Sequence, residues 1–163
     1  LKPAPTQIRR IAGSKIRLTI LMLGGGPEIR SKTQALFHMH SLDHVVEEMI
    51  EWAIPQVEAL GCQPCTLSFG LGRTAFEASS LSLEAMKEGC YDVQSELEKR
   101  ITDAVNSRGI GPIGLGGASS VLATFIKIGN IRASGFRVVS MRPNCCMEIR
   151  KASCEWETEN ENV

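Results

Sequence analysis

Thiols are the side chains of this sequence with the most distinctive chemistry. Cys62 and Cys65 bound a Cys-Gln-Pro-Cys segment, a spacing shared by redox thiol pairs and zinc sites. Six cysteines in 163 residues are too sparse for a disulfide scaffold, and in a reducing compartment clustered thiols more often bind metal or react. The remaining cysteines are Cys90, Cys145, Cys146 and Cys154.

Two familiar kinds of thiol site fit this pattern poorly. A redox pair begins a helix, whose dipole lowers the thiol pKa, but this pair leads into a strand-like run at Thr66 to Gly70. A zinc site needs two further ligands, and the adjacent Cys145 and Cys146 are a poor geometry for one ion. The histidines are expected in an exposed loop and a first helical turn, so no role is assigned to His38, His40 and His44.

A glycine-rich segment at Gly109 to Gly114 satisfies the pattern G-x-G-x-x-G. That pattern indicates dinucleotide binding only where it follows a strand and opens a helix. Here a predicted helix precedes the glycines and a predicted strand follows them, and Pro112 removes an amide that would face phosphate. No glycine loop of the sequence continues as Gly-Lys-Ser/Thr, so a phosphate-binding lysine loop is also disfavoured.

Hydrophobic periodicity predicts the first elements that position these motifs. Ser14 to Met22 alternates polar and apolar residues, which is typical of a half-buried strand. From Ser41 to Leu60, apolar residues recur every three or four positions. This spacing predicts an amphipathic helix that Ser41 caps and Pro55 kinks.

The rest of the chain alternates helices with strands. After the strand at Thr66 to Gly70, Thr74 and Glu77 would open a helix as a capping box. Asp92 would cap a further helix, and two β-rich segments follow. The element order predicts a mixed α/β class, a single domain over 1–163 and a flexible acidic tail at 155–163. The helix that Asp92 caps would bury Val93, Leu97, Ile101, Ala104 and Val105. The two β-rich segments are Ser119 to Ile128 and Phe136 to Met141.

Composition narrows the class of protein. With 43% hydrophobic and 22% charged residues, the chain suits a globular domain with a real core. Eighteen basic and eighteen acidic residues give zero net charge, so we expect neither nucleic acid nor a membrane surface as partner. The apolar runs are too short for a membrane helix, and Leu1 to Arg10 lacks the apolar core of a signal peptide, which predicts a cytoplasmic protein.

Four segments, in order, resemble the α region of class I, iron-sulfur-dependent fumarate hydratases and L-tartrate dehydratases. The most specific one reproduces the family pattern Gly-Ile-Gly-Pro-x-Gly-Leu-Gly-Gly. The resemblance covers nearly the whole chain and implies the later part of an α region, with its upstream segment located elsewhere. The four segments are Leu23 to Glu28, Gly61 to Thr74, Arg108 to Gly117 and Arg142 to Cys145.

In that family, three cysteines hold a 4Fe-4S cluster whose open iron acts as a Lewis acid on the substrate. The resemblance implies that Cys62 and Cys145 bind this cluster, and that the backbone at Gly26 approaches a substrate carboxylate. The first family ligand belongs to a segment upstream of Leu1, so this chain would supply two of three ligands. No catalytic side chain is assigned.

The chain departs from the family at two polar positions. Leu23 stands where relatives carry a lysine before the triple glycine, and the Arg132-Ala133 region stands where they carry a histidine. Arg150 lies one residue beyond a position that is often arginine in relatives and is Ile149 here.

The resemblance implies a subunit or fragment of a hydro-lyase that reversibly hydrates a dicarboxylate, and both fumarate and tartrate enzymes share these motifs. Such a chain would act in an oligomer with a β-type subunit or domain and with an upstream α segment. The alternative is a noncatalytic homologue that keeps the fold and serves as a structural or interaction subunit. Leu23 and the missing histidine favour that alternative.

Overall fold

The computed structural model describes residues 5–130, 134–145 and 149–157. Two compact units make up the chain. One combines Leu1–Met22 with Arg150–Val163, and the other is Leu23–Ile149. Among the described residues, no helix has the length and apolar character needed to cross a membrane.

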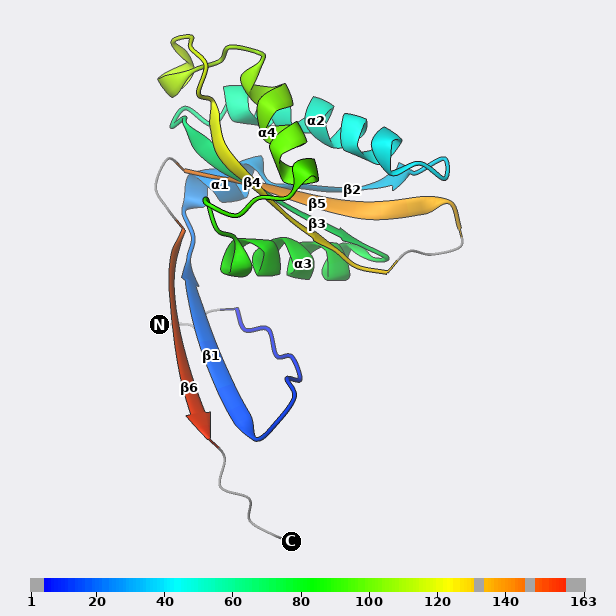
Figure 1. Ribbon diagram of the computed structural model, residues 1–163, viewed down its shortest axis with the longest axis vertical. Coiled ribbons are helices and arrows are strands. Elements are labelled where there is room, and N and C mark those ends of the chain that lie inside the picture. The colour runs from blue at the N-terminus through cyan, green and yellow to red at the C-terminus, as the bar shows by residue number, and fades with distance from the viewer. Residues whose placement is uncertain (1–4, 131–133, 146–148, 158–163) are drawn as a thin grey trace, which may run out of the picture. The chain divides into compact units, whose positions relative to one another are not determined.

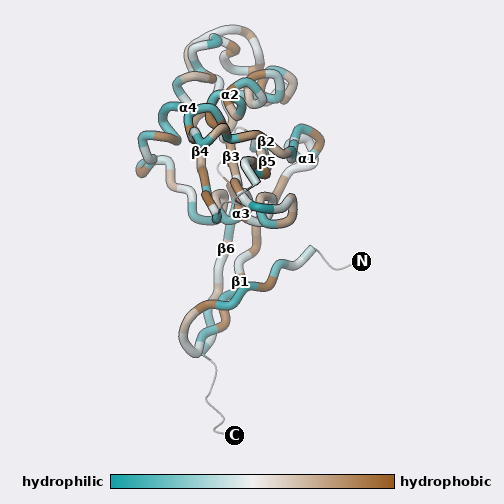
Figure 2. Tube along the Cα trace, turned by 90° about the vertical axis from the view of Figure 1, so that its right-hand side faces the viewer, coloured by the Kyte–Doolittle hydropathy of each residue, from teal (hydrophilic) through white to brown (hydrophobic). Residues whose placement is uncertain are grey.

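The first unit is a two-stranded antiparallel ribbon of β1 (Lys15–Met22) and β6 (Arg150–Glu157), which lie side by side in both views (Figures 1 and 2). The strand predicted at Ser14 to Met22 is present as β1, but its alternating apolar residues are exposed rather than buried. Glu155 and Glu157, expected in a flexible tail, lie in β6, and residues 158–163 of that tail are outside the described residues.

The second unit is built on a four-stranded sheet in the order β2-β5-β3-β4. Strands β3 and β4 are parallel, whereas β5 runs antiparallel to both β2 and β3. Helices α2 and α4 cover one face of the sheet and α3 covers the other (Figure 1). This arrangement confirms the mixed α/β class. The strands are β2 (Lys32–Phe37), β3 (Cys65–Gly72), β4 (Val121–Ile128) and β5 (Phe136–Asn144).

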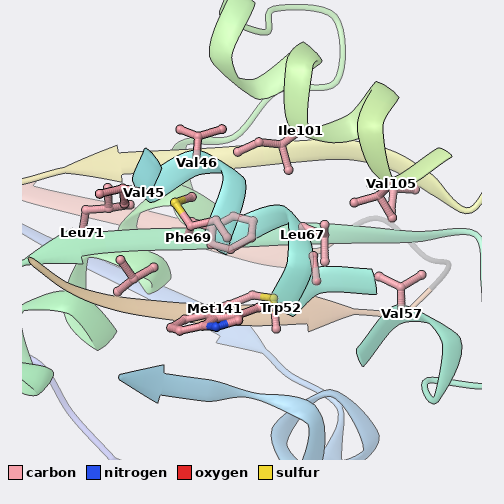
Figure 3. Packing of buried hydrophobic residues seen from close by; sticks show 14 of the residues in the cluster. Val45, Val46, Trp52, Val57, Leu67, Phe69, Leu71, Ile101, Val105 and Met141 are labelled. Atoms are coloured by element: carbon pink, nitrogen blue, oxygen red, sulfur yellow. The ribbon is translucent and has the colours of Figure 1, made fainter. Parts of the chain in front are cut away.

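Strand β3 is buried along its whole length and has two different faces. Leu67, Phe69 and Leu71 pack into the core with α2 (Leu42–Glu58) and α4 (Glu96–Asn106), as Figure 3 shows. On the opposite face, a Cβ added to Gly70 would lie 2.0 Å from the carbonyl oxygen of Ala78 in α3 (Ala75–Glu88). Glycine at this position therefore allows α3 to rest directly on the strand backbone.

Side-chain caps define where α2 and α3 begin. The Ser41 hydroxyl accepts a hydrogen bond from the His44 amide at 3.3 Å, as expected for the cap of α2. This helix continues through Pro55 to Glu58. The Thr74 hydroxyl accepts from the Glu77 amide at 3.1 Å, but the Glu77 carboxylate bonds the Arg73 amide at 2.7 Å instead of closing a reciprocal box.

The start of α4 differs from the prediction. Ser95, not Asp92, caps this helix, and Ser95 and Glu98 form a complete capping box. Val93, predicted to be buried, precedes the helix and is 76% exposed. The cap at Ser95 prevails because Glu98 stands three residues later and satisfies its amide at 2.7 Å. The elements that periodicity did not predict are α1 (Gly25–Arg30), β2, the 3-10 turn Pro112–Gly114 and β6.

The close contact at Gly70 leads to a stability prediction. In Gly70→Ala the new methyl group would overlap backbone atoms of Ala78 and Ser82. We therefore expect the free energy of unfolding to fall by about 3 kcal/mol. Urea denaturation followed by circular dichroism measures this change. Gly25→Ala is the matched control, because its Cβ would meet no atom within 4 Å, and it should leave stability unchanged or slightly higher. Equal stability of both variants would contradict the packing of α3 on β3.

Candidate thiol site

Three cysteines from two distant parts of the sequence lie near one end of the sheet. Cys62 lies in the loop after α2, Cys65 is the first residue of β3, and Cys145 directly follows the last residue of β5. Antiparallel pairing places Thr66 of β3 opposite Asn144 of β5, so the start of one strand adjoins the end of the other. The sheet register therefore brings Cys145 to the end of the sheet where Cys65 begins β3, and Cys62 lies three residues before Cys65.

The central thiol of this group is strongly affected by its surroundings. The pKa of Cys65 is raised to about 12, mainly by burial and further by the neighbouring Cys62 and Cys145. The Cys65 thiol is therefore neutral at physiological pH, whereas the thiolate is the form that binds metal. Cys62 and Cys145 are both partly exposed and belong to loops. Of the three thiols, these two are the more accessible to a ligand.

The triple-glycine segment lies against Cys145. A Cβ on Gly24 would be 3.8 Å from the Cys145 sulfur, which places the start of α1 beside that thiol. Cβ atoms on Gly25 and Gly26 would meet nothing within 4 Å. The backbone at Gly26, two residues beyond the contact with Cys145, therefore borders open space, where a ligand has room to approach the main chain.

A largely buried arginine connects α1 to the segment that ends in Cys145. Arg142, whose side chain is 11% exposed, forms an ion pair with Glu28 of α1. Its Nε is buried and has no hydrogen-bond partner among the described residues. Arg142 therefore has one unsatisfied donor, on the strand that ends directly before Cys145. Sequence reasoning missed this residue, and its only signal was its position three residues before Cys145 in the matched segment.

The second glycine segment is tied to the Cys62 loop. The Ile113 amide donates to the Gln63 carbonyl at 3.2 Å, and the Gly111 amide donates to the Ser120 hydroxyl at 3.0 Å. Gly111 has a φ of 70° and no room for a side chain, because a Cβ would lie 2.0 Å from the Gly116 oxygen. These contacts give Gly109 to Gly117 a packing role at the site.

Gln63 fixes the loop that holds Cys62. Its side-chain amide donates to the carbonyls of Val57 and Glu58, the latter at 3.2 Å, so it satisfies backbone groups at the end of α2. The residue is 3% exposed. The position of Cys62 thus depends on a side chain that anchors its loop to the preceding helix.

Several other sequence-level expectations lie away from this site. His38 was expected to be solvated but is 7% exposed, because its Nδ1 accepts the His40 amide at 3.0 Å in a turn where Met39 and His40 have positive φ. Cys90 and Cys154 are exposed, and Ile149 packs partly buried beside Ala85 and Phe125. The Arg132-Ala133 region and Cys146 fall outside the described residues.

The described residues meet only part of the requirement for an iron-sulfur cluster. Cys145 adjoins the open glycine segment and Cys62 lies in the loop before β3, while the third nearby thiol, Cys65, is buried. Across residues 5–130, 134–145 and 149–157, no group of three or more histidine, cysteine or acidic side chains is arranged to hold a metal ion. A complete cluster site would therefore need a ligand from outside this set.

The fold and the site define a mixed α/β protein in which two thiol loops and two glycine segments meet at one sheet end. The model of the fumarate hydratase (Fumerase) family matches residues 2–155. The chain belongs to this family, as the four matched segments predicted.

Alpha subunits of L(+)-tartrate dehydratases are among the relatives that this chain resembles. The chain is 28% identical over 120 residues to the L(+)-tartrate dehydratase subunit alpha of Escherichia coli, which covers 71% of this chain and 39% of that protein. It is 29% identical over 139 residues to a putative L(+)-tartrate dehydratase subunit alpha of Methanocaldococcus jannaschii, covering 82% of this chain and 47% of the relative. The chain thus spans less than half the length of these relatives.

The anchoring role of Gln63 can be tested directly. Gln63→Ala removes the hydrogen bonds to the end of α2, so we expect a loss of about 1–2 kcal/mol in the free energy of unfolding. Urea denaturation measures this loss. Gln56→Ala, on the same helix but without such bonds to its end, should change stability by less than about 0.5 kcal/mol. If Gln63→Ala were as stable as Gln56→Ala, the Cys62 loop would not depend on Gln63.

Proposed function

We propose that this chain is the α-type component of a hydro-lyase that reversibly adds water to a dicarboxylate of the fumarate or tartrate type. The observation that carries the proposal is that Cys62 and Cys145 both lie near Cys65 at one end of the sheet, with the triple-glycine segment beside Cys145. Family membership supports it, because the relatives named above are subunits of a dehydratase.

Cys62 and Cys145 would be two ligands of an iron-sulfur cluster. A bound cluster of this kind supplies a Lewis-acidic iron. The third ligand would come from another α segment, since Cys62 and Cys145 are the two partly exposed thiols near this end of the sheet among the described residues. Reducing conditions in the cytoplasm would keep these thiols available, so a cytoplasmic location belongs to the same proposal.

The remaining groups at the site would bind the substrate and orient it. The main chain at Gly26 would approach one carboxylate, because no side chain occupies that space. The buried cation of Arg142 would favour a negative charge nearby, although Glu28 already neutralises part of it. A β-type subunit would complete the site, as the designation of the relatives as alpha subunits implies for their own enzymes.

A second candidate is a noncatalytic homologue that serves as a structural or interaction subunit. Leu23 favours it, because this residue precedes the triple glycine and is 39% exposed, so it offers an apolar surface where relatives carry a cation. The incomplete thiol set is also compatible with this candidate. The two candidates differ in whether the assembled protein binds iron.

The test is anaerobic reconstitution of the chain with iron and sulfide, alone and after assembly with a β-type subunit and an upstream α segment. We expect the assembled complex to bind iron, absorb visible light and hydrate fumarate, measured by loss of the fumarate ultraviolet absorbance. Cys62→Ser and Cys145→Ser should each remove most of the iron, because a cluster with fewer than three ligands is weakly held. Cys90→Ser is the matched control, since Cys90 is exposed and distant from these loops in sequence.

The outcomes separate the two candidates. Iron that is lost in both site variants but kept in Cys90→Ser supports the hydro-lyase component. An assembled complex that forms, remains colourless and binds no iron would establish the structural homologue instead.

A further inference from the structure

The β1–β6 ribbon has an apolar face and a polar face. Its register places Ile16 opposite Trp156 and Leu18 opposite Cys154 on one face, while Arg17 lies opposite Glu155 on the other. The large apolar side chains are between 48% and 65% exposed. A two-stranded ribbon is marginally stable in water, and a third strand or a covering layer is needed to stabilise it. These large apolar residues are Ile16, Leu18, Ile20, Met22 and Trp156.

Strand β6 has an outer edge that can accept another strand. In the described part of the chain, β6 pairs with β1 alone, and all eight of its residues are exposed. Such an edge presents main-chain donors and acceptors to any strand of matching pattern. β1 has an outer edge too, but its charged residues are Lys15 and Arg17, both basic. β6 contains both signs of charge, so it alone of the two can complement a copy of itself.

We propose that β6 pairs antiparallel with β6 of a second copy of this chain, around a twofold axis at Cys154. Rotation about that axis places Glu157 opposite Lys151 of the second copy, and the reverse pair forms at the other end. Trp156 comes to lie opposite the small Ala152 of the second copy. The association therefore makes two opposite-charge pairs and two large-to-small pairs.

This register also preserves the two faces of the ribbon. Paired residues are either both even-numbered or both odd-numbered, so the apolar face continues across the new strand pair. The product is a four-stranded antiparallel sheet in the order β1-β6-β6-β1. A sheet with one apolar face can be stable on its own once it has three or more strands, and this sheet has four.

Neighbouring registers are less favourable. An axis at Ser153 would place Trp156 opposite Arg150 and would give Glu155 a third cation, although it already pairs with Arg17 at 2.5 Å and Lys15 at 3.8 Å. An axis at Glu155 would place two identical carboxylates against each other, which is destabilising. The axis at Cys154 avoids both arrangements.

Charge reversal tests the proposed pairs in the full 163-residue chain. Lys151→Glu and Glu157→Lys should each raise the dimer dissociation constant about tenfold, because two symmetry-related pairs change to like charges. The double variant Lys151→Glu with Glu157→Lys should restore the original constant. Sedimentation equilibrium over a concentration series measures all four proteins. Lys99→Glu, on the exposed side of α4, is the matched control and should have no effect.

The double variant also separates association from damage within one ribbon. Lys15 faces residue 157 in the same chain, so Glu157→Lys creates a like-charge pair there in both the single and the double variant. Recovery of the dimer in the double variant can therefore come only from restored opposite-charge pairs with the partner chain. A wild-type chain that stays monomeric, or a double variant as weak as the single ones, would overturn the proposal.

Cys154 reports the position of the axis. Directly opposed residues of antiparallel strands have Cα atoms about 4.5–5.5 Å apart, which lies within the range of a disulfide. With added diamide, two Cys154 thiols would form one disulfide, and their two protons and two electrons would reduce the azo bond to a hydrazine. Peptide mass spectrometry should find Cys154 linked to Cys154, with the link lost in Cys154→Ser and kept in Cys90→Ser. A dimer without this link would overturn the axis at Cys154.

Discussion

Strand β3 is confined by helices on both faces, and the two faces accept opposite kinds of side chain. Toward α2 and α4 it presents Leu67, Phe69 and Leu71, which fill the main core. Toward α3 it presents Gly70 and Gly72, where an added Cβ would collide with the helix backbone. This difference fixes the register of β3, because a shift by one residue would drive large side chains into α3 and leave the main core empty.

The fixed register of β3 also determines where the chemistry lies. Cys65 begins the strand and Cys62 precedes it by three residues, so both have little freedom relative to the core. Strand β5 runs antiparallel to β3 and delivers Cys145 to the same end. The glycine segments complete this end because they approach closely without side chains, one beside Cys145 and one on the Cys62 loop.

Local sequence patterns predicted the elements whose residues have a regular environment. Short-range patterns were sufficient for β1, which alternates, and for α2, which repeats apolar residues every three or four positions. They were also sufficient for the caps at Ser41 and Thr74, each of which bonds an amide three residues later. Strand β2 was missed because Leu36 is its only buried apolar residue, so periodicity gave no signal. Strand β6 was missed because all of it is exposed and it is defined by pairing with a strand at the other end of the chain.

The candidate site was predictable in its residue types but not in its geometry. Motif resemblance named Cys62, Cys145 and Gly26. The raised pKa of Cys65 beside both thiols and the buried donor of Arg142 depend on strand pairing, which the motifs do not describe. Asp92 and Ser95 were both plausible caps by type, and the carboxylate of Glu98 decided between them.

The positions of Cys62 and Cys145 have a consequence for folding as well as for binding. These residues lie at opposite ends of the segment that includes β3, α3, α4, β4 and β5. Any ligand held by both sulfurs would close that segment into a loop and would reduce the number of conformations open to the unfolded chain, much as a covalent cross-link does. Binding at the thiols would then raise the melting temperature of the whole α/β unit. The melting temperature would therefore report how much of the protein has the ligand bound.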